Sequence, residues 1–218
     1  MRTIRLSKPS EFASLVKTHI EHVASSHSRE IRIGLPGGRG SVPVVHGIAS
    51  IKRELLPRIE LYLVDERLSG STNKKTLLEV GLQELIDLGV FKESQLHIPQ
   101  KEGEFFDFEG ELDLLYLGVG EDGHFASLFP GSYPKLDHKE CKATTYIDNS
   151  PKEPPQRVTV TYRGFSKHAK KTNLFILFFG EGKRGAYERF LHQKENPSTL
   201  PVAFFARELF NLTIVTDL

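Results

Sequence analysis

The stretch that most constrains the fold is residues 113–132, which read D-L-L-Y-L-G-V-G-E-D-G-H-F-A-S-L-F-P-G-S. Its apolar run, residues 114–119, predicts a strand that is buried on both faces. Glycines follow closely, and glycine tolerates positive φ angles and a close approach to the backbone. Phe125 and Leu128 predict one short helical turn, which a Pro-Gly pair ends, with His124 where that turn begins. Ligands of open α/β sheets bind beyond the carboxyl ends of the strands, so this connection is a candidate site.

Two interpretations of this connection stay open. Closely spaced glycines beside a polar histidine are often only a tight link between a strand and a helix. Here the turn itself contains Glu121, Asp122, Gly123 and His124, so acids and a base are held together. Imidazole has an unperturbed pKa of about 6.5, which suits proton transfer near neutral pH. We therefore favour a working site with His124 as its base.

A second glycine-rich connection follows the predicted strand at residues 31–35 and precedes a predicted helix that begins near residue 44. Free backbone N–H groups and the dipole of a helix start together bind phosphate. The loop lacks the Gly-Lys-Ser/Thr of the nucleotide P-loop, and it is not G-x-G-x-x-G. A plain connection is the alternative. If the loop binds an anion, its contact residues are Gly37, Gly38, Arg39, Gly40 and Ser41.

Two further strand ends carry charges. The predicted strand at residues 61–64 runs into Asp65, Glu66 and Arg67, which mark either a site or a solvated rim. The apolar run at residues 174–179 is followed by a glycine-rich helix start that contains Lys183. A lysine at a helix start is disfavoured by the dipole, which hints at an anionic ligand, although an exposed lysine is the commoner case.

The alternation of strands and helices predicts an α/β fold. We expect a mostly parallel, Rossmann-like sheet with helices on both faces, in one domain over residues 1–218. Asn73 is expected to cap a helix, and residues 133–155 are expected to form an irregular loop that walls or covers the site. The remaining expected elements are a strand at 157–163, a helix at 165–171, and closing strands at 202–205 and 212–215.

Composition narrows the partners. Lys+Arg 29 against Asp+Glu 28 leaves a net charge of +1, so neither a nucleic-acid nor a membrane surface is expected. The single cysteine, Cys141, excludes an internal disulfide and a cysteine-based zinc site. No apolar run reaches the roughly 18 residues of a membrane span. We expect a cytoplasmic protein with no metal and no cofactor; its oligomeric state is open, with a monomer favoured.

Taken together, these strand ends resemble the 6-phosphogluconolactonase family. That family shows a glycine-rich loop after its first strand, then D-E-R, then G-x-G-x-D-G-H-T-A-S-L-F-P-G, an R-x-T strand and a late G-x-x-K. The middle motif stands here as residues 118–131 with Phe125 for the usual threonine, and residues 157–159 and 182–183 match the later elements. The first loop departs, because it is longer and lacks a threonine, and Leu68 stands where the family has an aromatic residue.

The resemblance implies hydrolysis of 6-phospho-D-glucono-1,5-lactone to 6-phosphogluconate, without a metal because a lactone is already activated. His124 is then the general base, and Asp65 orients it or holds a sugar hydroxyl. The residues expected to bind the substrate or its phosphate are Gly37, Gly38, Arg39, Gly40, Ser41, Arg67, Gly120, Asp122, Gly123, Arg157 and Lys183.

Two rival functions are weighed against this one. A glucosamine-6-phosphate deaminase would have a similar fold, but it favours a D-E-Y-type segment and an N-H-I-type centre, where this chain has D-E-R and D-G-H-F. A non-catalytic sensor of sugar phosphates would bind phosphogluconate without opening the lactone. The presence of both His124 and Asp65 argues against the sensor.

Overall fold

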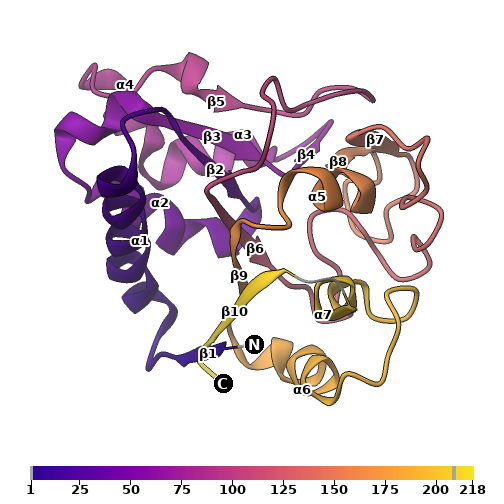
Figure 1. The fold of residues 1–218 in the computed structure, drawn as a ribbon. Helices are drawn as coiled ribbons and strands as arrows, with labels where there is room; N and C mark the ends of the chain where they lie inside the picture. The colour runs from indigo at the N-terminus through magenta and orange to yellow at the C-terminus, as the bar shows by residue number, and fades with distance from the viewer. Residues whose placement is uncertain (1, 208–209) are drawn as a thin grey trace.

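The computed structural model describes residues 2–207 and 210–218 of the chain. Its main layer is a seven-stranded sheet in the order β1-β10-β9-β6-β2-β3-β5 (Figure 1), and every pair of neighbours in it is parallel. This confirms the predicted α/β class. The strands are β1 (Arg2–Arg5), β2 (Ile31–Leu35), β3 (Ile59–Leu63), β5 (Leu96–His97), β6 (Leu114–Gly118), β9 (Asn173–Phe178) and β10 (Asn211–Thr216).

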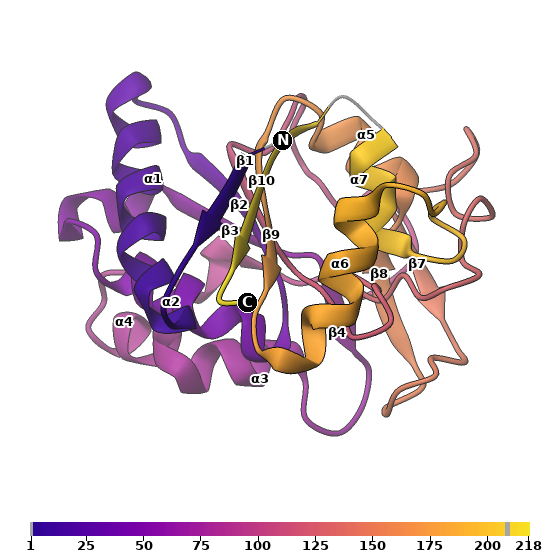
Figure 2. The same cartoon turned by 90° about the horizontal axis from the view of Figure 1, so that it is seen from below.

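Helices cover both faces of the sheet, as Figure 2 shows. The central strands are apolar on both sides because each face packs against a separate hydrophobic cluster. One face carries α1 (Phe12–Ser26), α2 (Val42–Ala49), α3 (Asn73–Leu77) and α4 (Gln83–Asp87), and the other carries α5 (Tyr162–His168), α6 (Arg184–His192) and α7 (Phe204–Arg207). None of the helices described is long and apolar enough to cross a membrane.

A second, antiparallel sheet lies beyond the carboxyl end of β3. Its order is β4-β8-β7, made of β4 (Asp65–Arg67), β8 (Arg157–Val160) and β7 (Thr144–Ile147). The register pairs Asp65 with Thr159 and Arg67 with Arg157. The Asp-Glu-Arg segment is therefore a short strand. Its pairing with β8 places the residues of β8 next to the candidate site.

Four local predictions are wrong. The helix predicted at 165–171 is α5, which spans Tyr162–His168. The strand predicted at 157–163 ends at Val160, because the Thr161 side chain accepts a hydrogen bond from the Gly164 backbone and starts α5 there. Thr72 rather than Asn73 caps α3, since its hydroxyl accepts from the Lys75 backbone. The excursion at 133–155 is not wholly irregular, because it contains β7.

The strand predicted at residues 202–205 is also wrong. This segment forms a 3₁₀ turn, Pro201–Ala203, followed by α7, and proline at the first position favours a helical start. The sheet is instead completed by β1, which pairs with β10 at the edge. The sequence of β1 is R-T-I-R, and its pattern of largely exposed residues has no apolar signal to reveal it.

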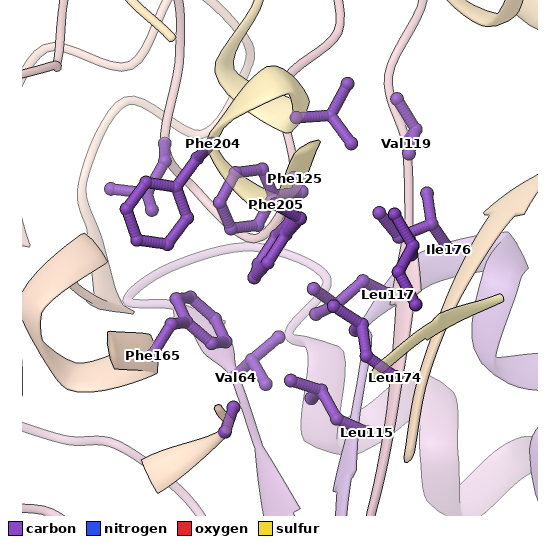
Figure 3. Close-up of a cluster of buried hydrophobic side chains, with 14 of the residues drawn as sticks. Val64, Leu115, Leu117, Val119, Phe125, Phe165, Leu174, Ile176, Phe204 and Phe205 are labelled. Atoms are coloured by element: carbon purple, nitrogen blue, oxygen red, sulfur yellow. The ribbon is translucent and has the colours of Figure 1, made fainter. Parts of the chain in front are cut away.

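Phe125 belongs to the cluster of buried side chains shown in Figure 3, where it lies near Phe204 and Phe205. Its side chain is fully buried, and its ring centroid lies 4.8 Å from that of Phe205 and 5.4 Å from that of Phe165. Replacing Phe125 by alanine is expected to lower the free energy of unfolding by about 3–5 kcal/mol, because a cavity remains. Urea denaturation measures this change. A loss below about 1 kcal/mol would show that the cluster repacks, and Phe125→Leu should cost less than alanine.

Candidate active site

The connection after β6 forms a closed turn rather than the predicted helical one. The Gly120 N–H donates to the His124 carbonyl at 2.7 Å, and the Gly123 N–H donates to the Gly120 carbonyl at 3.0 Å. Gly123 has φ +84°, a conformation that favours glycine. Phe125 then bridges back to Val119 in antiparallel pairing, so the chain does not continue as a helix. His124 is therefore held by a tight loop beyond the end of β6.

Asp122 is the direct carboxylate partner of His124. Its Oδ1 atom forms a short hydrogen bond with the His124 Nδ1 atom and accepts a second bond from the His124 backbone N–H at 3.3 Å. Burial opposes ionisation of Asp122, but the hydrogen bond and charge of His124 outweigh it and hold the pKa of this carboxyl well below its ordinary value. With Nδ1 engaged by a carboxylate, Nε2 is the nitrogen left for proton transfer.

The surroundings restrict the imidazole further. The His124 side chain is 16% exposed, so it is neither free in solvent nor sealed in the core. Its ring packs on Phe129 with a centroid distance of 4.6 Å, and the Arg157 guanidinium lies 5.7 Å from the same Phe129 ring. A Cβ atom added to Gly120 would lie 1.9 Å from the His124 Nδ1 atom, so only glycine leaves room for this imidazole.

Asp65 is buried in a separate hydrogen-bond network beside His124. Its Oδ2 atom accepts from the Ser127 hydroxyl at 2.7 Å, and the Ser127 backbone N–H donates to the Thr159 hydroxyl at 3.1 Å. Burial raises the pKa of Asp65, while the Ser127 bond and the charges of Arg157 and His124 oppose that shift. The carboxylate that contacts His124 Nδ1 is thus Asp122, and the charge of His124 favours the ionised form of Asp65.

Replacing Asp65 by asparagine is expected to stabilise the protein at neutral pH. Because burial raises the folded-state pKa of Asp65 above its ordinary 3.8, the ionised carboxylate costs folding free energy as the pH rises through the folded pKa. The advantage of Asp65→Asn should be absent below about pH 4 and grow toward neutrality. Urea unfolding at several pH values measures it, with the exposed Asp148→Asn as control. An advantage that does not vary with pH would contradict this account.

Glu66 and Asn73 fix the geometry behind the site. The Glu66 carboxylate accepts from the backbone N–H groups of Arg67, Asn73 and Lys74, so it caps α3. The buried Asn73 amide donates to the Asp65 carbonyl at 2.9 Å. It also occupies the space where a side chain at Gly37 would stand, since a Cβ there would lie 2.1 Å from the Asn73 Cγ atom. Asn73 therefore ties the glycine-rich loop to the strand that bears Asp65.

The loop after β2 lies against the end of β6. It forms a 3₁₀ turn, Gly38–Ser41, in which Gly38 has φ +62°. A Cβ atom on Gly40 would lie 3.5 Å from the Gly118 Cα atom, so this loop packs beside the strand that leads to His124. The Ser41 hydroxyl is already used, because it donates to the Gly38 carbonyl at 2.7 Å. The five predicted loop residues thus form one turn close to the histidine turn.

The predicted cations fall into two groups around the His124 turn. Lys183, in the 3₁₀ turn Glu181–Lys183, has its pKa lowered by burial, and it feels the charges of Glu121, Arg39 and Asp122. Arg67 and Arg157 instead lie near Asp65, and their charges favour its ionised form. The Arg67 Nη1 atom donates to the Ser71 carbonyl at 2.9 Å, and Arg157 binds backbone carbonyls of residues 152–154.

Sequence reasoning missed several residues that shape the site. The Ser127 hydroxyl donates to Asp65, and the Ser127 backbone N–H donates to the Thr159 hydroxyl of β8. The Phe129 ring packs on His124. Ser127 and Phe129 belong to the central motif, so their position in it was the available signal. The contact of Asn73 with Gly37 had no signal, since it joins two loops that are distant in sequence. Within residues 2–207 and 210–218, no group of three His, Cys, Asp or Glu side chains is arranged to hold a metal ion.

Fold and site together define an α/β protein whose candidate active site lies beyond the carboxyl ends of parallel strands. The profile of the family described as glucosamine-6-phosphate isomerases/6-phosphogluconolactonase matches residues 8–214. The chain belongs to this family, as the resemblance indicated.

Relatives of this chain are named 6-phosphogluconolactonases. A protein of Oryza sativa subsp. indica, named probable 6-phosphogluconolactonase 3, chloroplastic, is 33% identical over 165 residues, which cover 74% of this chain and 45% of that protein. The 6-phosphogluconolactonase of Homo sapiens is 46% identical over 101 residues, which cover 44% of this chain and 36% of the relative. These matches therefore span less than half the length of each relative.

Solved structures match over almost the whole chain. The 6-phosphogluconolactonase from Leishmania guyanensis has a TM-score of 0.76 at 15% identity, with 99% of this chain and 95% of that chain covered. The 6-phosphogluconolactonase from Thermotoga maritima has a TM-score of 0.70 at 20% identity, with 98% and 96% covered. At such low identity, the similarity establishes a shared fold.

Proposed function

We propose that this protein hydrolyses 6-phospho-D-glucono-1,5-lactone to 6-phosphogluconate, a step of the oxidative pentose phosphate pathway. The observation that carries the proposal is the His124–Asp122 pair on the closed glycine turn, with buried Asp65 beside it. An imidazole with one nitrogen held by a carboxylate is a poised general base. The names of the relatives agree with this reaction.

The proposed chemistry needs one base and one proton donor. His124 Nε2 takes a proton from water as the water oxygen attacks the lactone carbonyl carbon. The resulting oxyanion is stabilised by backbone N–H groups of the glycine-rich loops other than those of Gly120 and Gly123, which already donate within the turn. Each such donor is worth about 3 kcal/mol in comparable sites. The bond from the carbonyl carbon to the ring oxygen then breaks, and His124 returns its proton to that oxygen. Asp122 keeps the imidazole oriented through both steps.

In this proposal Asp65 holds a sugar hydroxyl or stabilises the charged imidazole. The phosphate group lies against the loop of Gly37, Gly38, Arg39, Gly40 and Ser41, with Arg67, Arg157 and Lys183 as cationic partners, while Gly120 and Gly123 let the lactone approach the turn. Backbone N–H groups and fixed cations are the usual ligands of phosphate.

A coupled assay with freshly generated phosphogluconolactone tests the function. We expect 6-phosphogluconate to form faster than by spontaneous hydrolysis, which sets the background. Release of ammonia from glucosamine 6-phosphate would favour the deaminase instead. Binding of 6-phosphogluconate without acceleration of lactone opening would favour a sensor.

The remaining features belong to the same proposal. We propose a single catalytic domain that works as a monomer in the cytoplasm, without a metal or another cofactor. Size-exclusion chromatography with light scattering tests the monomer. Retention of activity after dialysis against a chelator tests the independence from metal.

A further inference from the structure

The loop that precedes β8 is held in place by Arg157. This arginine is 5% exposed, and its Nε atom donates to the Pro154 carbonyl at 3.1 Å. Its Nη2 atom donates to the carbonyls of Lys152 and Glu153, at 3.0 Å and 3.1 Å. Three hydrogen bonds from one buried guanidinium fix consecutive carbonyls, so they set the position of residues 152–154 relative to β8.

The same loop is also tied within itself. The Ser150 hydroxyl donates to the Lys152 carbonyl at 2.8 Å and accepts from the Lys152 backbone N–H at 3.1 Å. The Ser150 backbone N–H donates to the Pro155 carbonyl at 2.9 Å. These contacts define the backbone of Lys152 on both sides, while its side chain stays exposed.

The charge of Lys152 reaches the histidine turn. It favours the ionised form of Asp122, the partner of His124, and it opposes the protonated form of Lys183. Arg39 acts on Lys183 in the same way. Packing contacts place the three segments that bear these cations around residues 120–124. A Cβ atom at Gly182, next to Lys183, would lie 2.8 Å from the Glu121 Oε1 atom, and the loop of Arg39 lies beside Gly118. Arg157, which holds the Lys152 carbonyl, lies 5.7 Å from the Phe129 ring that packs on His124. Glu121 and Asp122 lie in the same cluster, but Asp122 is already paired with His124, so a bound anion would compensate the remaining positive charge.

We propose that Lys152 binds the phosphate group of the substrate together with Lys183 and Arg39, and that Arg157 is the positioning residue that presents it. This inference rests on the proposed function and extends it to a residue that sequence reasoning passed over. It also gives Arg157 an indirect role, because its Nε and Nη2 atoms are engaged by the loop carbonyls.

The test compares Lys152→Ala with wild type on two substrates. For phosphogluconolactone, KM should rise about tenfold while kcat stays within about twofold, as expected when a binding contact is lost. For glucono-1,5-lactone, which lacks the phosphate, kcat/KM should not change. Lys142→Ala removes another exposed lysine of the same excursion and should behave as wild type on both substrates. An unchanged KM in Lys152→Ala, or an equal effect on both lactones, would overturn the proposal.

A double-mutant comparison tests the positioning role of Arg157. If Arg157 acts through Lys152, Arg157→Ala should raise KM for phosphogluconolactone, and the double variant should show less than the product of the two single effects. Effects that multiply fully would contradict this role.

Direct binding separates this inference from the proposed function. Calorimetry with inorganic phosphate and with 6-phosphogluconate should show about tenfold weaker binding of both by Lys152→Ala than by wild type. If wild type opens no lactone but this weakening is observed, the proposed function fails and the phosphate contact stands. If wild type is an active lactonase and binding is unaltered in Lys152→Ala, the phosphate contact fails alone.

Discussion

Replacing His124 by alanine is expected to lower kcat for phosphogluconolactone by about 10²–10⁴, because the only proton acceptor proposed for the attacking water is lost. Binding of 6-phosphogluconate should persist, since the glycine-rich loop and the cations are untouched. The free energy of unfolding should also fall, because the imidazole, which is 16% exposed, loses its hydrogen bond with Asp122 and its packing on Phe129. Steady-state kinetics and calorimetry of the same preparation measure these quantities.

His138→Ala is the matched control, since His138 is an exposed histidine of the 133–155 excursion. It should leave both kcat and KM at the wild-type values. Unaltered turnover in His124→Ala would remove this imidazole from the mechanism. A loss of product binding equal to the loss of kcat would instead indicate that the variant disturbs the whole turn.

A single methyl group at position 120 should have an effect of similar size. In Gly120→Ala the new Cβ would stand 1.9 Å from the His124 Nδ1 atom and 2.7 Å from the Asp122 Oδ1 atom, so the ring must leave its present position. The φ angle of Gly120 is not in the left-handed region, so alanine adds no backbone strain there. Because a displacement of about 1 Å can cost roughly 10²-fold in rate, we expect kcat to fall by about 10²–10³.

Gly118→Ala provides the comparison for this variant. A Cβ atom at Gly118 would meet the Gly40 Cα atom at 3.8 Å, which is ordinary van der Waals contact, so activity and stability should both be kept. Nuclear magnetic resonance of the His124 ring would report its displacement in Gly120→Ala directly. Full activity in Gly120→Ala would mean that the position of the imidazole seen here is not the one used in catalysis.

The main sheet could be predicted well because its central strands have a simple physical signature. β6 and β9 are short apolar runs bounded by glycine or charge, as strands covered on both faces must be. β1 escaped prediction because an exposed edge strand needs no apolar pattern. The segment 202–205 misled for the opposite reason: its apolar residues serve a buried helical turn, and periodicity cannot separate the two over so short a run.

The candidate site was only partly predictable. The apolar patterns of individual strands located the strand ends that precede His124, Asp65 and Lys183, because the carboxyl ends of parallel strands meet at one edge of the sheet. They could not reveal that the contact of His124 Nδ1 is with Asp122, or that Arg157 is used by a neighbouring loop. The first contact depends on the closed turn, and the second depends on the antiparallel sheet. That sheet joins segments that are distant in sequence.

At three glycines of this site, the space that a side chain would occupy is filled by the side chain of another residue. Asn73 fills the space beside Gly37, and the imidazole of His124 fills the space beside Gly120. Leu200 fills the space beside Gly123. Each glycine and the side chain beside it share one space, so a mutation at one position changes which residues the other position will accept. A larger residue at position 37 should therefore appear only together with a smaller one at position 73. Gly120 and Gly123 should stay glycine, because the proposed base His124 fills the space beside one and the other has a positive φ angle.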